Sequence, residues 1–291
     1  MDERWYLRRL SERDLRFLAE AGGSASPEAI ARLRAEPWRI RRLIESPTTF
    51  DALFAPWGED PLILVDPFLV FSVLLAGATR ELGSVRFVRE WIGPRQRLPV
   101  FDVETLRAFL GDELRRVFLA ELLASYTHVA SGTLWVRSGR GWRRLRFNEL
   151  DPVRLAALLE VLPEAERTSV YRRLGDLALF LTGVFPDFAA ERMVPVQVER
   201  LERVLAEVSG RTDDVPDEPA GTIGLLERLG RRSYRAALGG ASGRGPVLHA
   251  DLARALEEFS ERFGQARRIL NFLTDAHLFP LRETWFGPGT G

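Results

Sequence analysis

Along most of the chain, apolar residues recur three or four positions apart, which is the spacing of an amphipathic helix. Residues 102–125 follow this pattern, with a break near Gly111. The segment 164–185 predicts a central helix, and its second half is apolar on every side, which indicates full burial. Further helices are predicted over residues 11–21, 196–208, 222–238 and 246–278.

Two of the predicted helix starts carry a capping residue followed by proline. Ser26 precedes Pro27, and Asp66 precedes Pro67, an arrangement that satisfies the first backbone N–H groups of a helix. The most apolar stretch, residues 62–78, is divided by this second pair. What remains is far shorter than the ~20 residues that span a bilayer. We therefore expect a buried helix here and no membrane association.

One segment departs from helical spacing. Residues 133–147 place β-branched and aromatic residues on both sides of a short turn that contains Gly139 and Gly141, which predicts a β-hairpin. Two isolated strands are only marginally stable, so this hairpin is expected to pack against helices. The predicted fold is mainly α, a compact multi-helix array with one β-hairpin.

The chain is expected to form a single helical domain over residues 1–291. Within it, two lobes over 1–130 and 148–286 would be joined by the hairpin at 133–147. The acidic segment 210–221 (GRTDDVPDEPAG) contains proline and glycine and predicts a flexible loop, and residues 239–245 predict a second one.

The composition removes several kinds of chemistry. All 41 basic residues are Arg, so the chain has no Lys, and it has no Cys. A Schiff-base lysine, a P-loop lysine, a thiol nucleophile and a Cys-ligated zinc are therefore excluded. The coding bias of a GC-rich genome is the simplest origin of the missing Lys. The formal net charge of +0 does not favour a protein whose whole surface binds nucleic acid.

Motifs for metals, cofactors and secretion are not found. The three histidines, His128, His249 and His277, are scattered, and no HExxH or GxSxG occurs. Residues 1–10 lack the apolar run of a signal peptide. We expect no metal, no cofactor and a cytoplasmic location, and the sequence leaves enzymatic activity undecided while favouring a non-enzymatic protein.

The predicted hairpin is rich in arginine and tryptophan, which suits contacts with phosphates, bases or a protein partner. The alternative is a solvated hairpin whose charges discourage edge-to-edge pairing. The residues that would make contacts are Trp135, Arg137, Arg140, Trp142, Arg143, Arg144 and Arg146.

A polar cluster is predicted on the central helix. Asp176 falls among apolar residues, one turn after Arg172, and a buried carboxylate is costly unless it is paired. One alternative is an ion pair with Arg172, joined by Tyr171 or by Tyr234 from another helix. The other is a carboxylate of raised pKa that lines a pocket and acts as an acid or base.

The segment Tyr171–Asp187 (YRRLGDLALFLTGVFPD) is similar to a helix motif of uncharacterised bacterial helical proteins, Y-x-x-L-G-D-x-x-L-F-x-x-G-x-F. In that family a G-x-x-x-Y segment follows, here Gly230–Tyr234, and then an amphipathic helix, here Phe259–Asp275. The resemblance covers the C-terminal third to half of the chain. The resemblance implies that Gly175 and Asp176 have structural roles in a helical core, and it implies no activity.

The function favoured by these observations is a non-enzymatic cytoplasmic protein that acts through contacts with a partner protein or with its own copies. The Arg-rich hairpin and the aromatic pair Trp285–Phe286 are the expected surfaces, because interfaces are enriched in Trp and Arg. Two alternatives stay open: nucleic-acid binding through the hairpin, and small-molecule binding or catalysis at a pocket near Asp176.

Overall fold

The computed structural model describes residues 5–54, 60–93, 96–128, 131–138, 141–187, 198–203, 221–241, 250–278 and 281–286, without the side chains of 131–147. The chain divides into two compact units. Unit 1 comprises Met1–Arg86 and Val103–Thr127, and unit 2 comprises Phe87–Asp102 and His128–Gly291. Residues 87–102 thus belong with the C-terminal part of the chain. The prediction of one domain with lobes over 1–130 and 148–286 stays a prediction.

Unit 1 is built from helices, two of which start at the predicted Ser26–Pro27 and Asp66–Pro67 pairs. The Asp66 side chain makes no cap hydrogen bond, contrary to the prediction, and accepts one from Arg13 Nη2 at 2.6 Å instead. The Ser26 hydroxyl accepts a hydrogen bond from the backbone N–H of Ala29, with Pro27 as the first helical residue. The helices are α1 (Glu12–Ala21), α2 (Pro27–Ala35), α3 (Trp38–Ile44), α4 (Pro47–Phe54), α5 (Pro61–Leu64), α6 (Pro67–Glu81), α7 (Val103–Gly111) and α8 (Glu113–Ser125).

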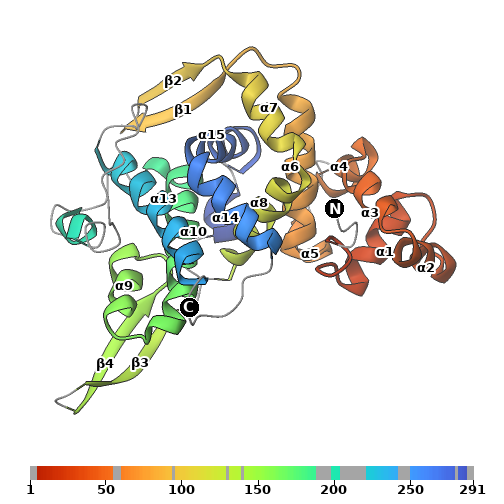
Figure 1. Cartoon of the computed structure of the whole chain (residues 1–291). Coiled ribbons are helices and arrows are strands. Elements are labelled where there is room, and N and C mark those ends of the chain that lie inside the picture. The colour runs from red at the N-terminus through yellow and green to blue at the C-terminus, as the bar shows by residue number, and fades with distance from the viewer. Residues whose placement is uncertain are drawn as a thin grey trace. The chain divides into compact units, whose positions relative to one another are not determined.

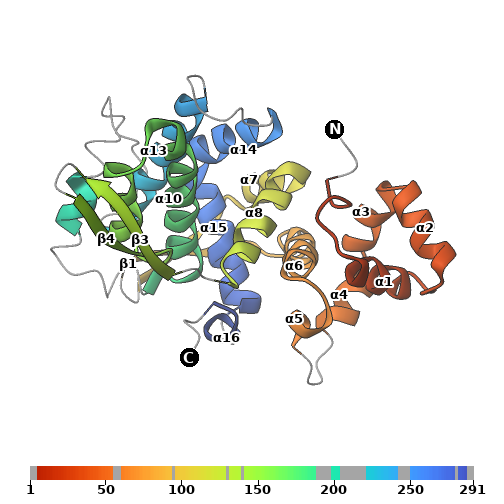
Figure 2. The same cartoon turned by 90° about the horizontal axis from the view of Figure 1, so that it is seen from below.

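The core of unit 1 forms around α6, which is buried on every side from Phe68 to Ala78 and packs against α8 (Figure 2). The predicted helix over 102–125 is divided at Gly111 into α7 and α8, as expected. Among the described residues, no helix combines the length and the apolar character needed to cross a membrane.

Unit 2 contains both β-hairpins and the two longest of the described helices (Figure 1). Its elements are β1 (Val88–Gly93), β2 (Gln96–Val100), β3 (Ser131–Ser138), β4 (Gly141–Asn148), α9 (Pro152–Ala156), a 3-10 turn (Ala157–Glu160), α10 (Glu164–Val184), α13 (Gly221–Ala241), α14 (Ala250–Glu261), α15 (Phe263–Leu273), a π-helical turn (Thr274–Leu278) and α16 (Arg282–Phe286). Residues 198–203 are also helical. The mainly α class is confirmed.

The predicted hairpin at 133–147 is confirmed as β3 and β4, which pair antiparallel with Trp135 opposite Arg144. The structure adds a second antiparallel hairpin, β1–β2, which the sequence did not predict. Its strands carry charged residues and Pro99, and therefore lack the apolar run of a typical strand.

The core of unit 2 depends on close helix crossings at glycine. A Cβ on Gly175 of α10 would lie 2.5 Å from Cδ1 of the Tyr234 ring on α13. A Cβ on Gly230 of α13 would lie 2.3 Å from Cε2 of Phe263. Both distances are far below van der Waals contact, so only glycine lets an aromatic ring lie directly on the neighbouring helix.

Two expectations about the C-terminal part are wrong. The single helix predicted over 246–278 is interrupted at Arg262, which has φ −109° and ψ 29° and separates α14 from α15. Trp285 and Phe286 are buried, and the Phe286 ring packs edge-on against Phe180 at 5.1 Å between ring centroids. These two aromatics fill the core and offer no surface.

Some predicted segments fall partly or wholly outside the described residues. Of the loop predicted over 210–221, only Gly221 is described, and α13 begins there. Of the loop 239–245, the first three residues belong to the end of α13 and the rest are outside. Of the helix predicted over 196–208, residues 198–203 are described and are helical.

Candidate functional site

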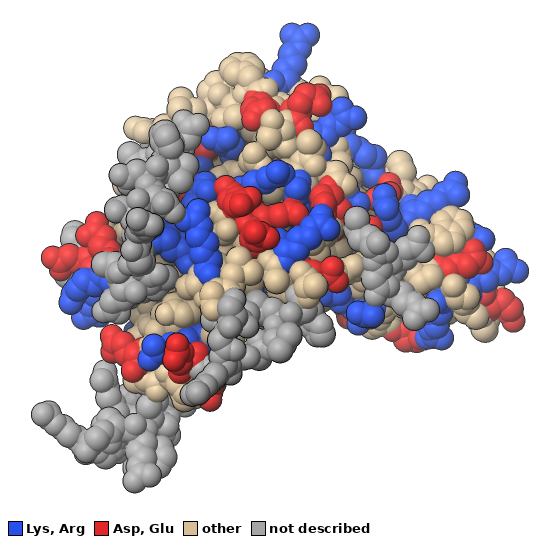
Figure 3. All heavy atoms as spheres, in the orientation of Figure 1, with Lys and Arg blue, Asp and Glu red and all other residues tan. Residues whose placement is uncertain are grey.

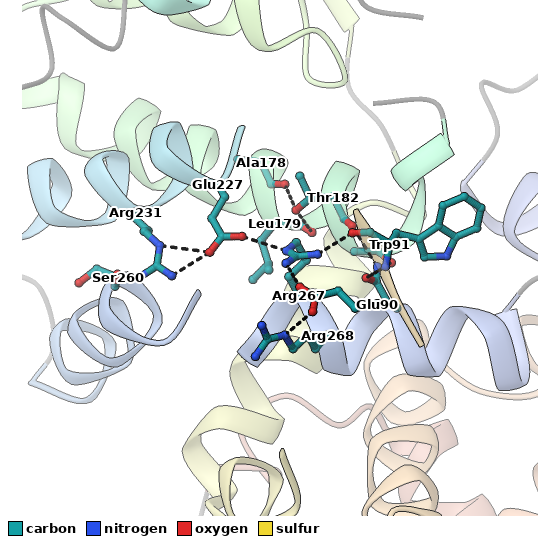
Figure 4. A network of polar contacts seen from close by, with 12 residues as sticks. Glu90, Trp91, Ala178, Leu179, Thr182, Glu227, Arg231, Ser260, Arg267 and Arg268 are labelled. Carbon is teal, nitrogen blue, oxygen red and sulfur yellow. Dashed lines mark hydrogen bonds and ion pairs between the residues drawn. The ribbon is translucent and has the colours of Figure 1, made fainter. Parts of the chain in front are cut away.

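The most extensive polar network described in unit 2 is centred on Arg267 of α15, whose side chain is 1% exposed (Figure 4). Its guanidinium donates to Glu90 on β1, and its Nε donates to Oε2 of Glu227 on α13 at 2.9 Å. Arg268 Nε donates to the second oxygen of Glu90 at 2.9 Å. Arg231 Nη2 donates to the second oxygen of Glu227 at 2.8 Å.

This network leaves no carboxylate oxygen without a guanidinium donor. Glu90 and Glu227 each accept from two arginines, one at each oxygen. Burial of these charges is tolerated because every one is paired and hydrogen-bonded. The carboxylates are therefore engaged in holding three elements together, β1, α13 and α15.

The backbone of β1 is fixed by the same helix. The Trp91 carbonyl accepts a hydrogen bond from Arg267 Nη1 at 3.0 Å, and the Trp91 N–H donates to Oδ1 of Asn271 at 3.3 Å. The Asn271 amide in turn donates to the carbonyls of Thr182 and Gly183 near the end of α10, at 3.0 and 2.8 Å. One strand of the hairpin is thus attached to two helices of the core.

The side chain of Trp91 is covered by Arg97 from β2. The Arg97 guanidinium lies 4.1 Å from the centroid of the indole ring and pairs with Asp275 of the π-helical turn at 3.3 Å. A cation placed over a tryptophan face is attracted to the ring electrons. This contact holds β2 in place, and Gln96, Leu98 and Pro99 of the same strand are exposed.

The hairpin carries several exposed apolar side chains. Phe87 is 43% exposed and Phe101 is 72% exposed, and their ring centroids lie 5.9 Å apart. Arg89 is paired with Pro99 across the strands, and both are exposed. Phe87 directly precedes β1 and Phe101 directly follows β2, and alternation continued from the Arg89–Pro99 pair places all four on one side of the hairpin. We call Phe87, Arg89, Pro99 and Phe101 the contact face; Leu98, 52% exposed, lies on the other side.

The predicted polar cluster of the central helix is present, and its contacts are those of the ion-pair alternative. Tyr234 donates its phenolic O–H to Oδ1 of Asp176 at 2.9 Å, and Arg172 Nε lies 3.7 Å from Oδ2. Tyr171 is half-buried on the same helix. The Tyr234 ring also fills the space over Gly175, so these residues are close-packed.

The side chains of the predicted Arg-rich surface lie outside the described residues: Trp135, Arg137, Arg140, Trp142, Arg143, Arg144 and Arg146. Their role in nucleic-acid or partner contact stays a prediction. Within the described part of the chain, no group of three His, Asp or Glu side chains could hold a metal ion.

Unit 1 has its own buried polar cluster. Arg116 is buried and donates to Oε1 of Glu45 at 2.7 Å and to the Leu110 carbonyl at 2.6 Å. Arg41 Nε donates to the same Glu45 oxygen at 3.1 Å. Tyr6 lies beside Arg116, and burial raises the pKa of its phenol to about 12, against the opposing effect of that guanidinium.

Sequence reasoning missed Glu90, Glu227 and Arg267. One signal was present: Arg267 lies four residues after Phe263 and three before Leu270, at an apolar position of its helix. A charge at such a position predicts a buried partner. Nothing in the local sequence, however, identifies Glu90 as that partner, because it is separated from Arg267 by 177 residues.

On the face shown in Figure 3, arginines and acidic residues are interspersed over the described residues, without a large area of one sign. Comparison with protein-family models, with curated proteins and with solved structures found no match.

Proposed function

We propose that this chain is a non-enzymatic cytoplasmic protein that acts by binding a partner protein, and that the contact face of the β1–β2 hairpin is its binding surface. The observation that carries the proposal is the exposure of Phe87 and Phe101 side by side. Aromatic residues and arginine are enriched at protein interfaces and dominate their binding energy, and the contact face combines both.

The support of the hairpin strengthens this proposal. β1 is held from beneath by Arg267 and Asn271, and β2 by Arg97 over Trp91. A surface that is already ordered loses little conformational entropy on binding. The buried charges thus serve a rigid platform, which is a role in recognition and not in bond-making chemistry.

The contact face also indicates the kind of partner. Pro99 has no N–H to offer, and proline on an edge strand discourages the addition of another strand, so binding would use side chains. Arg89 is exposed among the aromatics and favours an apolar surface with an acidic rim. A symmetric contact with a second copy would bring two such arginines together, which favours a different protein.

Site-specific photo-crosslinking in the host cell tests this function. A photoreactive phenylalanine analogue at Phe101 should give one defined cross-linked protein, and the Phe87→Ser change should abolish it. The same analogue at Ile63, an equally exposed apolar residue of unit 1, is the matched control and should not give that product.

Absence of a cross-link at Phe101, or the same products from both positions, would refute the contact face. Native mass spectrometry of the full chain completes the test. A monomer of 32.9 kDa is expected, whereas a dimer that the Phe87→Ser change dissociates would show that the face binds a second copy instead.

A further inference from the structure

A groove opens on unit 1, independently of the contact face. It has a volume of about 630 Å³ and lies between the end of α1, the helix α2 and the helix α3. That volume is within the range of roughly 300–1,000 Å³ that small-molecule sites occupy. Its lining includes the apolar residues Leu33 and Leu43 together with several polar residues.

The charge of the lining is positive. Arg32 projects from α2, and Arg39 and Arg42 project from α3. The carboxylate that lines the groove, Glu45, is already engaged by Arg116 and Arg41, neither of which lines it. A ligand in the groove therefore meets guanidinium groups and one carboxylate, whose charge Arg116 and Arg41 already neutralise.

Two of these guanidinium groups are available. Arg39 pairs with Glu36 at 2.8 Å, whereas Arg42 has no carboxylate within salt-bridge distance among the described residues. Arg32 also has none there, and its charge acts on the exposed Glu28, one turn away on α2. Taking Arg39 as neutralised by Glu36 leaves Arg32 and Arg42, which together match the charge of a phosphate dianion.

The groove also offers an aromatic surface. Trp38 lines it and is 43% exposed, although tryptophan is usually buried. The Arg39 guanidinium lies 4.8 Å from the centroid of one ring of Trp38. An indole held in this way provides a face on which a flat ring can stack, and stacking on an aromatic side chain does not depend on the identity of the base.

We propose that this groove binds a small phosphate monoester that carries a flat ring, the chemistry of a nucleoside monophosphate. Arg32 and Arg42 hold the phosphate, because guanidinium groups match its geometry with paired hydrogen bonds. Trp38 receives the ring. The site serves recognition, and no bond is made or broken in it.

Isothermal titration calorimetry of the full chain with adenosine monophosphate tests the proposal, with ribose 5-phosphate and adenosine as partial ligands. Saturable binding at one site per chain is expected, weakening as salt is raised because the contact is between charges. Arg42→Gln and Arg32→Gln should each weaken it about tenfold or more, the loss expected for a charged hydrogen bond.

Matched variants separate the groove from general charge. Arg16→Gln removes an exposed arginine of the same unit that does not line the groove, and should leave the affinity within about twofold. Trp38→Leu should weaken the binding of adenosine monophosphate and leave the binding of ribose 5-phosphate unchanged. Ala29→Trp fills the groove without changing its charge and should abolish binding of both, with circular dichroism confirming that each variant is folded.

Failure of the unmodified chain to bind adenosine monophosphate and ribose 5-phosphate saturably would overturn the proposal. Equal weakening by Arg16→Gln and Arg42→Gln would also overturn it, because binding would then follow net charge and not the groove. Retained binding in folded Ala29→Trp would place the ligand elsewhere. None of these results bears on the contact face, which lies in the other unit.

Discussion

Replacing Arg267 by methionine tests whether the buried network holds unit 2 together. The change keeps an apolar stem of similar length and removes the guanidinium that Glu90 and Glu227 share. Both carboxylates stay buried, with side chains 8% and 2% exposed. Each then retains one arginine partner, Arg268 and Arg231 respectively.

The expected cost follows from these contacts. Breaking a buried ion pair by removing one partner costs about 3–5 kcal/mol, because a charge is left buried without compensation. The remaining arginines reduce this cost, so we expect Arg267→Met to lower the free energy of unfolding by about 3 kcal/mol. Arg268→Met is the matched control. Its side chain is 24% exposed, and Glu90 is its one ion-pair partner among the described residues, so its loss should cost under about 1 kcal/mol.

Urea unfolding followed by circular dichroism measures both variants, and hydrogen exchange read by mass spectrometry locates the effect. Exchange in Arg267→Met should rise first in β1, whose Trp91 carbonyl loses its donor. Adding Glu227→Gln should recover part of the stability, because it removes one of the two buried carboxylates that have each lost a guanidinium donor. Equal costs for Arg267→Met and Arg268→Met, or unchanged exchange in β1, would refute the reasoning.

Three further changes test other parts of the fold. Since burial raises the pKa of Tyr6 to about 12 and unfolded tyrosine titrates near 10, its contribution to stability is complete below about pH 10 and is lost as pH rises toward 12. Between about pH 8 and pH 11, the free energy of unfolding measured in urea should therefore fall by on the order of 1 kcal/mol less in Tyr6→Phe than in the parent chain. An equal fall in both proteins would contradict this reasoning. In thermal melts, Gly230→Ala should destabilise the protein by about 1–3 kcal/mol through overpacking. Gly239→Ala on the same helix has nothing within 4 Å of the new Cβ and should stabilise the protein by up to about 1 kcal/mol. A change of the same sign for both variants would contradict the packing argument. Tyr234→Phe should cost about 1–3 kcal/mol in urea unfolding, because buried Asp176 loses a donor, and a neutral effect would show that this bond contributes nothing.

The local patterns of the sequence were sufficient for much of the fold. Helical periodicity identified α10 almost to the residue, and the break between α7 and α8 at Gly111 followed from one glycine. The pairing of Asp176 with Arg172 was among the alternatives because the two are four residues apart on one helix. Each of these features depends on neighbours in the chain.

Features that depend on distant residues were missed. β1 is a strand although it contains the charged residues Arg89 and Glu90. The charge of Glu90 is tolerated there because it pairs with Arg267 and Arg268 on α15. The exposure of Phe101 could not be read from its hydrophobicity, which would place it in the core. Trp285 was expected at the surface because interfaces are enriched in tryptophan, and it is buried.

The glycine crossings of unit 2 have a consequence for how this sequence can evolve. Gly175 lies under Tyr234, and Gly230 lies under Phe263, each at a separation that admits no Cβ. A larger residue at either glycine is tolerable only if the facing ring becomes smaller in the same lineage. Positions 175 and 234, and positions 230 and 263, should therefore change together among related sequences, although both pairs are far apart in the chain. Such paired changes could be used to identify relatives of this chain whose overall sequence identity to it is low.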